Sequence, residues 1–259
     1  MVSRFARLFV LLFLLVFVAG FHGAQGALIT SFDGAFQLTT PAPGWSYLWN
    51  SAGPIGDPAN YALLLPNSSG VYTTDGSDAI PAPAPANYLN LSLPGGFPGG
   101  HPGMGALQDG SGGIERYCIA AYTLASAETV SIHSGFVKNI NPNSGGSTDG
   151  VSVKVFVNDN PLPALSGGTA PGFESTTTFS VALGALNAGD KVYVAIGSKD
   201  TDLFDGFHLR YDVVAVPEPA TYLTAVTALV TVAGVVGSRR QRSAQVTHVA
   251  TGGARPTCS

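Results

Sequence analysis

The stretch Val151-Ser-Val-Lys-Val-Phe-Val-Asn158 places a valine at every second position. Successive side chains of a β-strand point to opposite faces, so the four valines share one face while Ser152, Lys154 and Asn158 share the other. A strand with this pattern lies with one face on a core and the other toward solvent. The segment therefore predicts one strand of a β-sheet that is covered on its valine side.

The rest of residues 27–215 repeats this pattern in short segments. Gly, Pro, Ser, Thr, Asn and Asp interrupt the chain every 8 to 12 residues, and no segment has convincing helical periodicity. This arrangement predicts an all-β domain, a two-sheet sandwich of jelly-roll type, and it disfavours a parallel α/β enzyme fold. The further candidate strands are Leu28–Leu38, Trp45–Trp49, Tyr61–Leu65, Tyr88–Leu93, Ile114–Tyr122, Thr129–Phe136, Thr176–Leu183, Lys191–Gly197 and Phe207–Val214.

Residues 1–26 have the composition of an export signal rather than of a folded element. Arg4 and Arg7 precede an uncharged apolar run from Leu8 to Ala19, and small residues follow at Ala24-Gln25-Gly26. The run is shorter than the roughly 20 residues that a permanent membrane-spanning helix needs. We therefore predict a signal peptide that signal peptidase removes.

The predicted exported part is strongly acidic. All sixteen Asp and Glu residues lie between Asp33 and Glu218, together with only six Lys and Arg residues, so this part carries a net charge of −10. Phosphate binding needs clustered cations, which excludes nucleic acid as an expected partner. The two cysteines, Cys118 and Cys258, lie on either side of a C-terminal apolar segment, and no internal disulfide is expected to stabilise the domain.

The composition changes abruptly after residue 215. Val216-Pro217-Glu218-Pro219 is followed by the uncharged segment 220–237 and then by Arg239, Arg240 and Arg242 within residues 238–242. Eighteen helical residues span about 27 Å, which matches the hydrocarbon core of a bilayer. Arginines stay on the cytoplasmic side of a membrane, so the sequence predicts a single transmembrane helix with the β-domain outside.

This order of Pro-Glu-Pro, apolar segment and arginine cluster resembles the PEP-CTERM sorting signal of exosortase substrates. The resemblance covers residues 216–242, about a tenth of the chain, and it extends to no named family for the β-domain. It implies that Pro217, Glu218 and Pro219 form the recognition element of an exosortase, a membrane-embedded transpeptidase that cuts near them. Family members usually end just after the arginines, whereas this chain continues as a predicted cytoplasmic tail, residues 243–259.

No constellation of catalytic residues stands out. The sequence contains no Gly-x-Ser-x-Gly, no His-Glu-x-x-His and no cluster of Cys or His with metal-ligand spacing. The interpretation is a non-enzymatic protein of the cell surface or extracellular matrix, associated with exopolysaccharide. A secreted glycan hydrolase is the less favoured enzyme alternative.

Two groups of residues are candidate binding sites. Asp200, Asp202 and Asp205 offer three carboxylates within six residues beside Gly206, which suits a Ca²⁺ site, although a solvated acidic turn has the same appearance. No other cofactor is expected.

The second group is aromatic. Trp45, Tyr47 and Trp49 share one face of a strand, where they form either sandwich core, the favoured reading, or a sugar-stacking platform. A carbohydrate-binding module that uses this stripe and the glycine-rich loop 94–113 is the alternative function. The other aromatic residues assigned to the core include Phe136, Phe156 and Tyr193.

Overall fold

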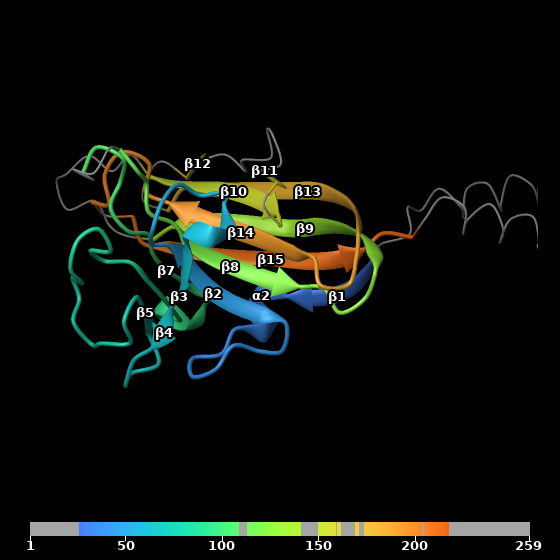
Figure 1. Ribbon diagram of the computed structural model, residues 1–259, viewed down its shortest axis with the longest axis horizontal. Helices are drawn as coiled ribbons and strands as arrows, with labels where there is room; N and C mark the ends of the chain where they lie inside the picture. The colour runs from blue at the N-terminus through green and yellow to red at the C-terminus, as the bar shows by residue number, and fades with distance from the viewer. Residues whose placement is uncertain are drawn as a thin grey trace, which may run out of the picture. The chain divides into compact units, whose positions relative to one another are not determined.

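Two antiparallel β-sheets make up nearly all the regular structure of the residues that the structure describes (Figure 1). The computed structural model describes residues 26–108, 113–140, 150–158, 160–161, 169–170, 174–203 and 205–217. Within these residues the only α-helix is the single turn α2 (Phe32–Ala35), and two 3₁₀ turns, η1 (Pro58–Asn60) and η2 (Pro94–Gly96), accompany it. The all-β prediction is confirmed.

The first sheet has eight strands. Seven of them follow the order β13-β9-β15-β7-β6-β5-β4, and β1 pairs with β15 beside this path. The bounds are β13 (Thr176–Leu186), β9 (Glu128–Asn139), β15 (Phe207–Ala215), β7 (Gly99–His101), β6 (Asn90–Ser92), β5 (Tyr72–Thr73), β4 (Leu65–Pro66) and β1 (Ala27–Ser31).

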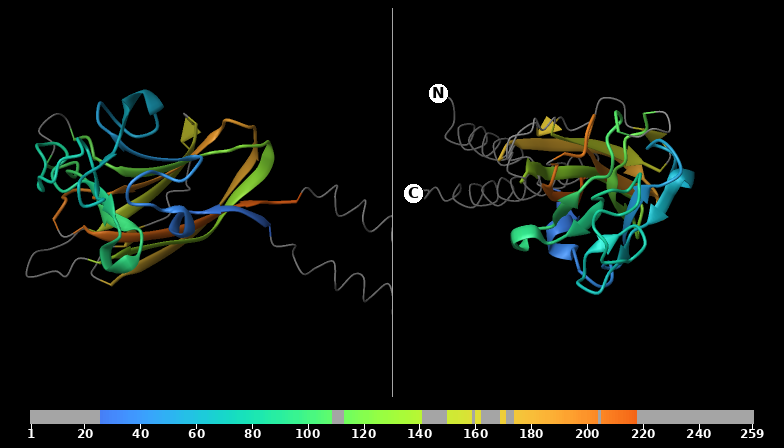
Figure 2. Two further views of the ribbon diagram at one scale, coloured as in Figure 1. Left: turned by 90° about the horizontal axis from the view of Figure 1, so that it is seen from below. Right: turned by 90° about the vertical axis from the view of Figure 1, so that its left-hand side faces the viewer.

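The second sheet has seven strands in the order β11-β10-β14-β8-β2-β3, with β12 paired to β10. Figure 2 shows the two sheets as facing layers. The bounds are β11 (Asn160–Pro161), β10 (Val151–Val157), β14 (Lys191–Gly197), β8 (Cys118–Thr123), β2 (Trp45–Asn50), β3 (Tyr61–Leu63) and β12 (Thr169–Ala170).

The main hydrophobic core lies between the two sheets. Val151, Val153, Val155 and Val157 of β10 are all buried in it, which confirms the face that the alternation predicts. The core also takes the inward residues of β9 and β15, such as Ile132 and Tyr211. Burial of this apolar surface supplies the main driving force for folding of the sandwich.

A smaller core covers the outer face of the second sheet. It includes Tyr117, Ile119, Phe156 and Tyr193, with Tyr61 packed against it. The loop that joins β2 to β3 lies here, because Gly56 N–H donates to the Tyr61 hydroxyl at 2.8 Å. The second sheet is therefore apolar on both faces, whereas the outer face of the first sheet keeps polar side chains.

The structure differs from the prediction in two segments, the predicted strand Leu28–Leu38 and the glycine-rich loop 94–113. The predicted strand Leu28–Leu38 stops at Ser31, because Phe36 N–H donates back to the Phe32 carbonyl and closes a helical turn. The predicted loop 94–113 contains β7. A methyl group on Gly99 or Gly100 would overlap the carbonyl oxygen of Phe207 or of Asn90, so glycine permits this close pairing.

The first and last strands of the fold are paired with each other. Ala27 of β1 lies opposite Ala215 of β15, and Ser31 lies opposite Asp212. Residues 26–216 form one compact unit. Both ends of this unit therefore leave it at the same place.

The predicted targeting segments fall largely outside the described residues. Residues 1–25 and the segment 218–259, with Glu218, Pro219, Arg239, Arg240, Arg242 and the tail 243–259, lie there. In the part of the chain that the structure describes, no helix has the length and apolarity to cross a bilayer. Pro217 follows Val216, whose N–H donates to the Thr129 carbonyl at 2.7 Å.

Candidate functional site

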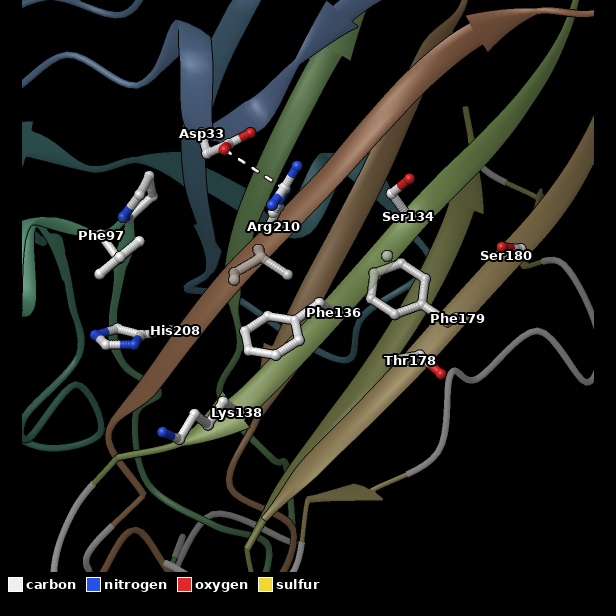
Figure 3. A pocket seen from close by; sticks show the side chains of 13 residues that line it. Asp33, Phe97, Ser134, Phe136, Lys138, Thr178, Phe179, Ser180, His208 and Arg210 are labelled. Atoms are coloured by element: carbon white, nitrogen blue, oxygen red, sulfur yellow. Dashed lines mark ion pairs between the residues drawn. The ribbon is translucent and has the colours of Figure 1, made fainter. Parts of the chain in front are cut away.

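An open groove of about 830 Å³ lies on the outer face of the first sheet (Figure 3). Its floor is formed by β9, β13 and β15, and the segment around Phe97 and Pro98 forms one wall. Asp33 of α2 lies at the end of the groove beside Arg210. This face stays open because the strand residues that point into it are polar or only half-buried.

Two rows of side chains cross the floor from strand to strand. His208 of β15 pairs with Lys138 of β9, which pairs in turn with Thr176 of β13. In the next row Arg210 pairs with Phe136, which is opposite Thr178. Directly opposed residues have Cβ atoms about 5 Å apart, so each row forms a continuous strip of contacts.

The wall of the groove carries an exposed aromatic ring. Phe97 is 62% exposed, and its ring centroid lies 5.5 Å from that of His208. A hydrogen-bond contact fixes the orientation of the His208 ring, because its Nε2 lies 2.8 Å from the carbonyl oxygen of Pro94 in η2. Phe97 thus presents an apolar ring beside the floor of the groove, which makes the wall a candidate contact surface.

The cations of the groove form ion pairs near its rim. Arg210 Nε lies 3.6 Å from Asp33 Oδ2, as the dashed line in Figure 3 marks, and Lys138 pairs with Glu174. The Arg210 and Glu174 side chains are more than half exposed. Such exposed pairs contribute about 0 to 1 kcal/mol, so they orient the cations without preventing exchange for another anion.

These features suit a sugar chain. Apolar CH groups of a pyranose pack on flat aromatic rings such as Phe97 and Phe136, and the sugar hydroxyls accept from or donate to charged and hydroxyl side chains. Thr178, Ser134 and Ser180 supply the hydroxyl groups along the other edge. The groove thus combines apolar faces with a polar border.

The aromatic stripe predicted from the sequence does not reach this surface. Trp45 and Tyr47 are 5% and 1% exposed, and Trp49 packs against the same core. The Trp45 ring lies 5.4 Å from Phe32, and Tyr47 lies 4.7 Å from Tyr72. The three residues share one face, as predicted, and this face belongs to the core; sugar stacking by Trp45 and Tyr47 is excluded because other rings cover them.

The aspartates of the predicted turn take different positions. The buried Asp202 carboxylate accepts hydrogen bonds from Asn87 Nδ2 and Gln108 Nε2, each at 2.7 Å, and so joins three loops. Asp205 is also buried, whereas Asp200 is exposed and its carbonyl accepts from Leu107 N–H.

Calcium binding at this turn stays a prediction. Among residues that the structure describes, no three His, Cys, Asp or Glu side chains converge as ligands of one metal ion. The nearby His101 has a lowered pKa because burial disfavours its charged form, against the opposing effects of the Pro102 carbonyl and Asp202. Cys118 is a free, buried thiol that donates to the Asn90 carbonyl at 3.1 Å.

Sequence reasoning missed the groove residues for a definite reason. Phe136, assigned to the core, lies on the outer face because the β9 chain carries an irregular residue, Ser134, with φ 52°, just before it. The sequence pattern that could have revealed the groove is the alternation along β15. The outward positions of this strand hold His208, Arg210 and Asp212, and its inward residues are all apolar. A histidine and an arginine on one strand face are conspicuous in a chain so poor in cations.

The fold and the groove together define an all-β domain of two antiparallel sheets with a surface groove on one of them. No protein-family model, curated protein or solved structure matched the chain.

Proposed function

We propose that this chain is an exported, non-enzymatic surface protein that binds extracellular polysaccharide through the groove on its first sheet. The observation that carries the proposal is the pair of half-buried and exposed rings, Phe136 and Phe97, set among hydroxyl and charged side chains. Carbohydrate sites need this combination, because apolar faces and hydroxyl groups alternate on the sugar. The groove replaces the Trp45–Trp49 stripe as the binding surface.

In this function the protein lies at the cell envelope because of its two terminal segments. A signal peptide over residues 1–26 directs export, and the sorting segment 216–242 holds the protein in the membrane until an exosortase cuts near Pro217-Glu218-Pro219. This is supported by the resemblance to PEP-CTERM signals. It is also supported by the pairing of β1 with the end of β15, because both segments then join the domain at one place.

The architecture that we propose for the domain is a jelly roll. The longer strands of the first sheet follow the order β1-β15-β9-β13, and those of the second follow β2-β8-β14-β10. From β8 to β15 the chain passes from one sheet to the other at each successive long strand. This alternation, with the first and last strands adjacent, supports the jelly-roll assignment, with β2 and β3 added beside β8.

The double variant Phe97→Ala and Phe136→Ala tests the proposed function. We expect the full chain, purified in mild detergent, to be retained on at least one of a panel of immobilised neutral and acidic polysaccharides. Removing both rings should weaken this retention at least about tenfold, because each aromatic contact contributes roughly 0.5 to 1.5 kcal/mol beyond its buried area.

Affinity electrophoresis provides the measurement, and Tyr88→Ala provides the control. Tyr88 is also aromatic and 42% exposed, but it does not line the groove. If no polysaccharide of the panel retains the wild-type chain, or if the double variant binds like the wild type and Tyr88→Ala, the proposed function is wrong.

A further inference from the structure

We infer that the groove selects an acidic polysaccharide, one whose sugars carry carboxylates; this inference rests on the proposed function and specifies its ligand. The groove is richer in cations than the rest of the exported part. Its lining includes two of the six cations found there, Lys138 and Arg210, and one carboxylate, Asp33. The lining is therefore richer in cations than the rest of this region of net charge −10, and each of the two cations pairs with one exchangeable carboxylate, Arg210 with Asp33 and Lys138 with Glu174.

The positions of the two cations match a chain that lies across the strands. Lys138 and Arg210 stand in adjacent rows of the floor, on neighbouring strands, with the Phe136 ring beside both. The groove floor spans the strands β13, β9 and β15, a width of about 10 Å at about 4.8 Å per strand spacing, and Phe97 and Pro98 stand beside it. A sugar ring on Phe136 would therefore hold its substituents within reach of a cation on either side.

The guanidinium of Arg210 is suited to a carboxylate. A planar guanidinium donates two parallel hydrogen bonds to a carboxylate, which gives geometric as well as electrostatic selection. Asp33 now occupies one side of this group at a distance of 3.6 Å from Nε, and the Arg210 side chain is 59% exposed. Figure 3 shows the Arg210 side chain directed toward Asp33 at the border of the groove that both residues line.

The strong negative charge of the surrounding surface makes the preference specific. A protein of net charge −10 repels an anionic polymer in general, so any attraction has to come from a local cationic site. Lys138 and Arg210 provide this site together with the rings, whereas other cations such as Lys191 of β14 lie on the second sheet. The acidic surface thus restricts anionic ligands to the groove.

The test compares polygalacturonate with its fully methyl-esterified form, which has the same backbone and no charge. In affinity electrophoresis at 50 mM salt, the full chain should bind polygalacturonate at least about tenfold more tightly than the ester. The double variant Lys138→Gln and Arg210→Gln should lose this difference, and Lys191→Gln should keep it. Raising the salt to 300 mM should weaken polygalacturonate binding by the wild type, because salt screens exposed charges.

The possible results separate this inference from the proposed function. Equal or stronger binding of the ester, or a Lys138→Gln and Arg210→Gln variant that still prefers polygalacturonate, overturns the acidic selectivity and leaves polysaccharide binding intact. Retention by neither polymer also overturns it, and the broader panel with the Phe97→Ala and Phe136→Ala variant then decides separately on the proposed function.

Discussion

Phe32→Ala is expected to lower the free energy of unfolding by about 3 to 5 kcal/mol, the usual cost of deleting a buried phenylalanine ring. Phe32 is fully buried, and its ring centroid lies 5.3 Å from Tyr211 in stacked geometry and 5.4 Å from Trp45. Tyr211 belongs to the first sheet and Trp45 to the second, so this ring joins the two layers. For a domain of this size the melting temperature should fall by roughly 10 °C or more.

Phe97→Ala is the matched control for this prediction. The same side chain is removed, but Phe97 is 62% exposed, so stability should change by no more than about 0.5 kcal/mol. Thermal unfolding followed by tryptophan fluorescence is a suitable measurement, because Trp45 contacts Phe32 directly. Phe32→Leu gives a smaller, measurable loss if Phe32→Ala does not fold. Equal melting temperatures for Phe32→Ala and Phe97→Ala would contradict the core described here.

Replacement of the Pro217-Glu218-Pro219 element by three alanines should abolish processing of the C-terminus. Two prolines would stop a helix in the apolar segment from continuing toward the domain and would favour an extended peptide that a protease cleft can bind. Strand β15 ends at Ala215, and the Val216 N–H still donates a hydrogen bond to the Thr129 carbonyl. The Pro-Glu-Pro element therefore begins directly after the last residue that is hydrogen-bonded to the sheet. Alanine removes both the prolines and the carboxylate that an exosortase would recognise.

Mass spectrometry of the protein recovered from the envelope measures this effect. The wild-type protein should end near residues 217–220, whereas the triple alanine variant should retain peptides that contain Arg239, Arg240 and Arg242. Pro256→Ala removes a proline from the tail 243–259 and should leave processing unchanged. A wild-type protein that keeps the arginine cluster, or a triple variant that is processed normally, would contradict sorting by an exosortase. The chain would then be an ordinary membrane-anchored protein.

The alternation of apolar residues was sufficient to predict the sheets because it is a local property of each strand. It located the buried face of β10 correctly, and it placed Trp45, Tyr47 and Trp49 on one face of β2. Whether these three aromatic residues belong to the core or form a surface on which sugars stack depends on which other residues cover them. That information is non-local, because the covering rings Phe32 and Tyr211 come from α2 and β15.

The groove was not predictable in the same way because its parts come together only through strand pairing. Phe97, Phe136 and His208 are far apart in the sequence, and their meeting depends on the register of β9 and β15 and on β7. The glycines that allow β7 to pair predict a loop, because glycine has no side chain and so gives no alternating pattern by which a strand could be recognised. The predicted aspartate turn was also a local feature of the sequence. The residues that bind Asp202 in the structure are Asn87 and Gln108, which lie about a hundred residues away.

Hydroxyl-radical footprinting of the full chain, with and without a retained polysaccharide, tests the location of the binding site most directly. Bound polymer should reduce oxidation of Phe97, Phe136 and His208 and leave the exposed Tyr88 unaffected. Unchanged oxidation at the two phenylalanines, or equal protection of Tyr88, would contradict polysaccharide binding in the groove.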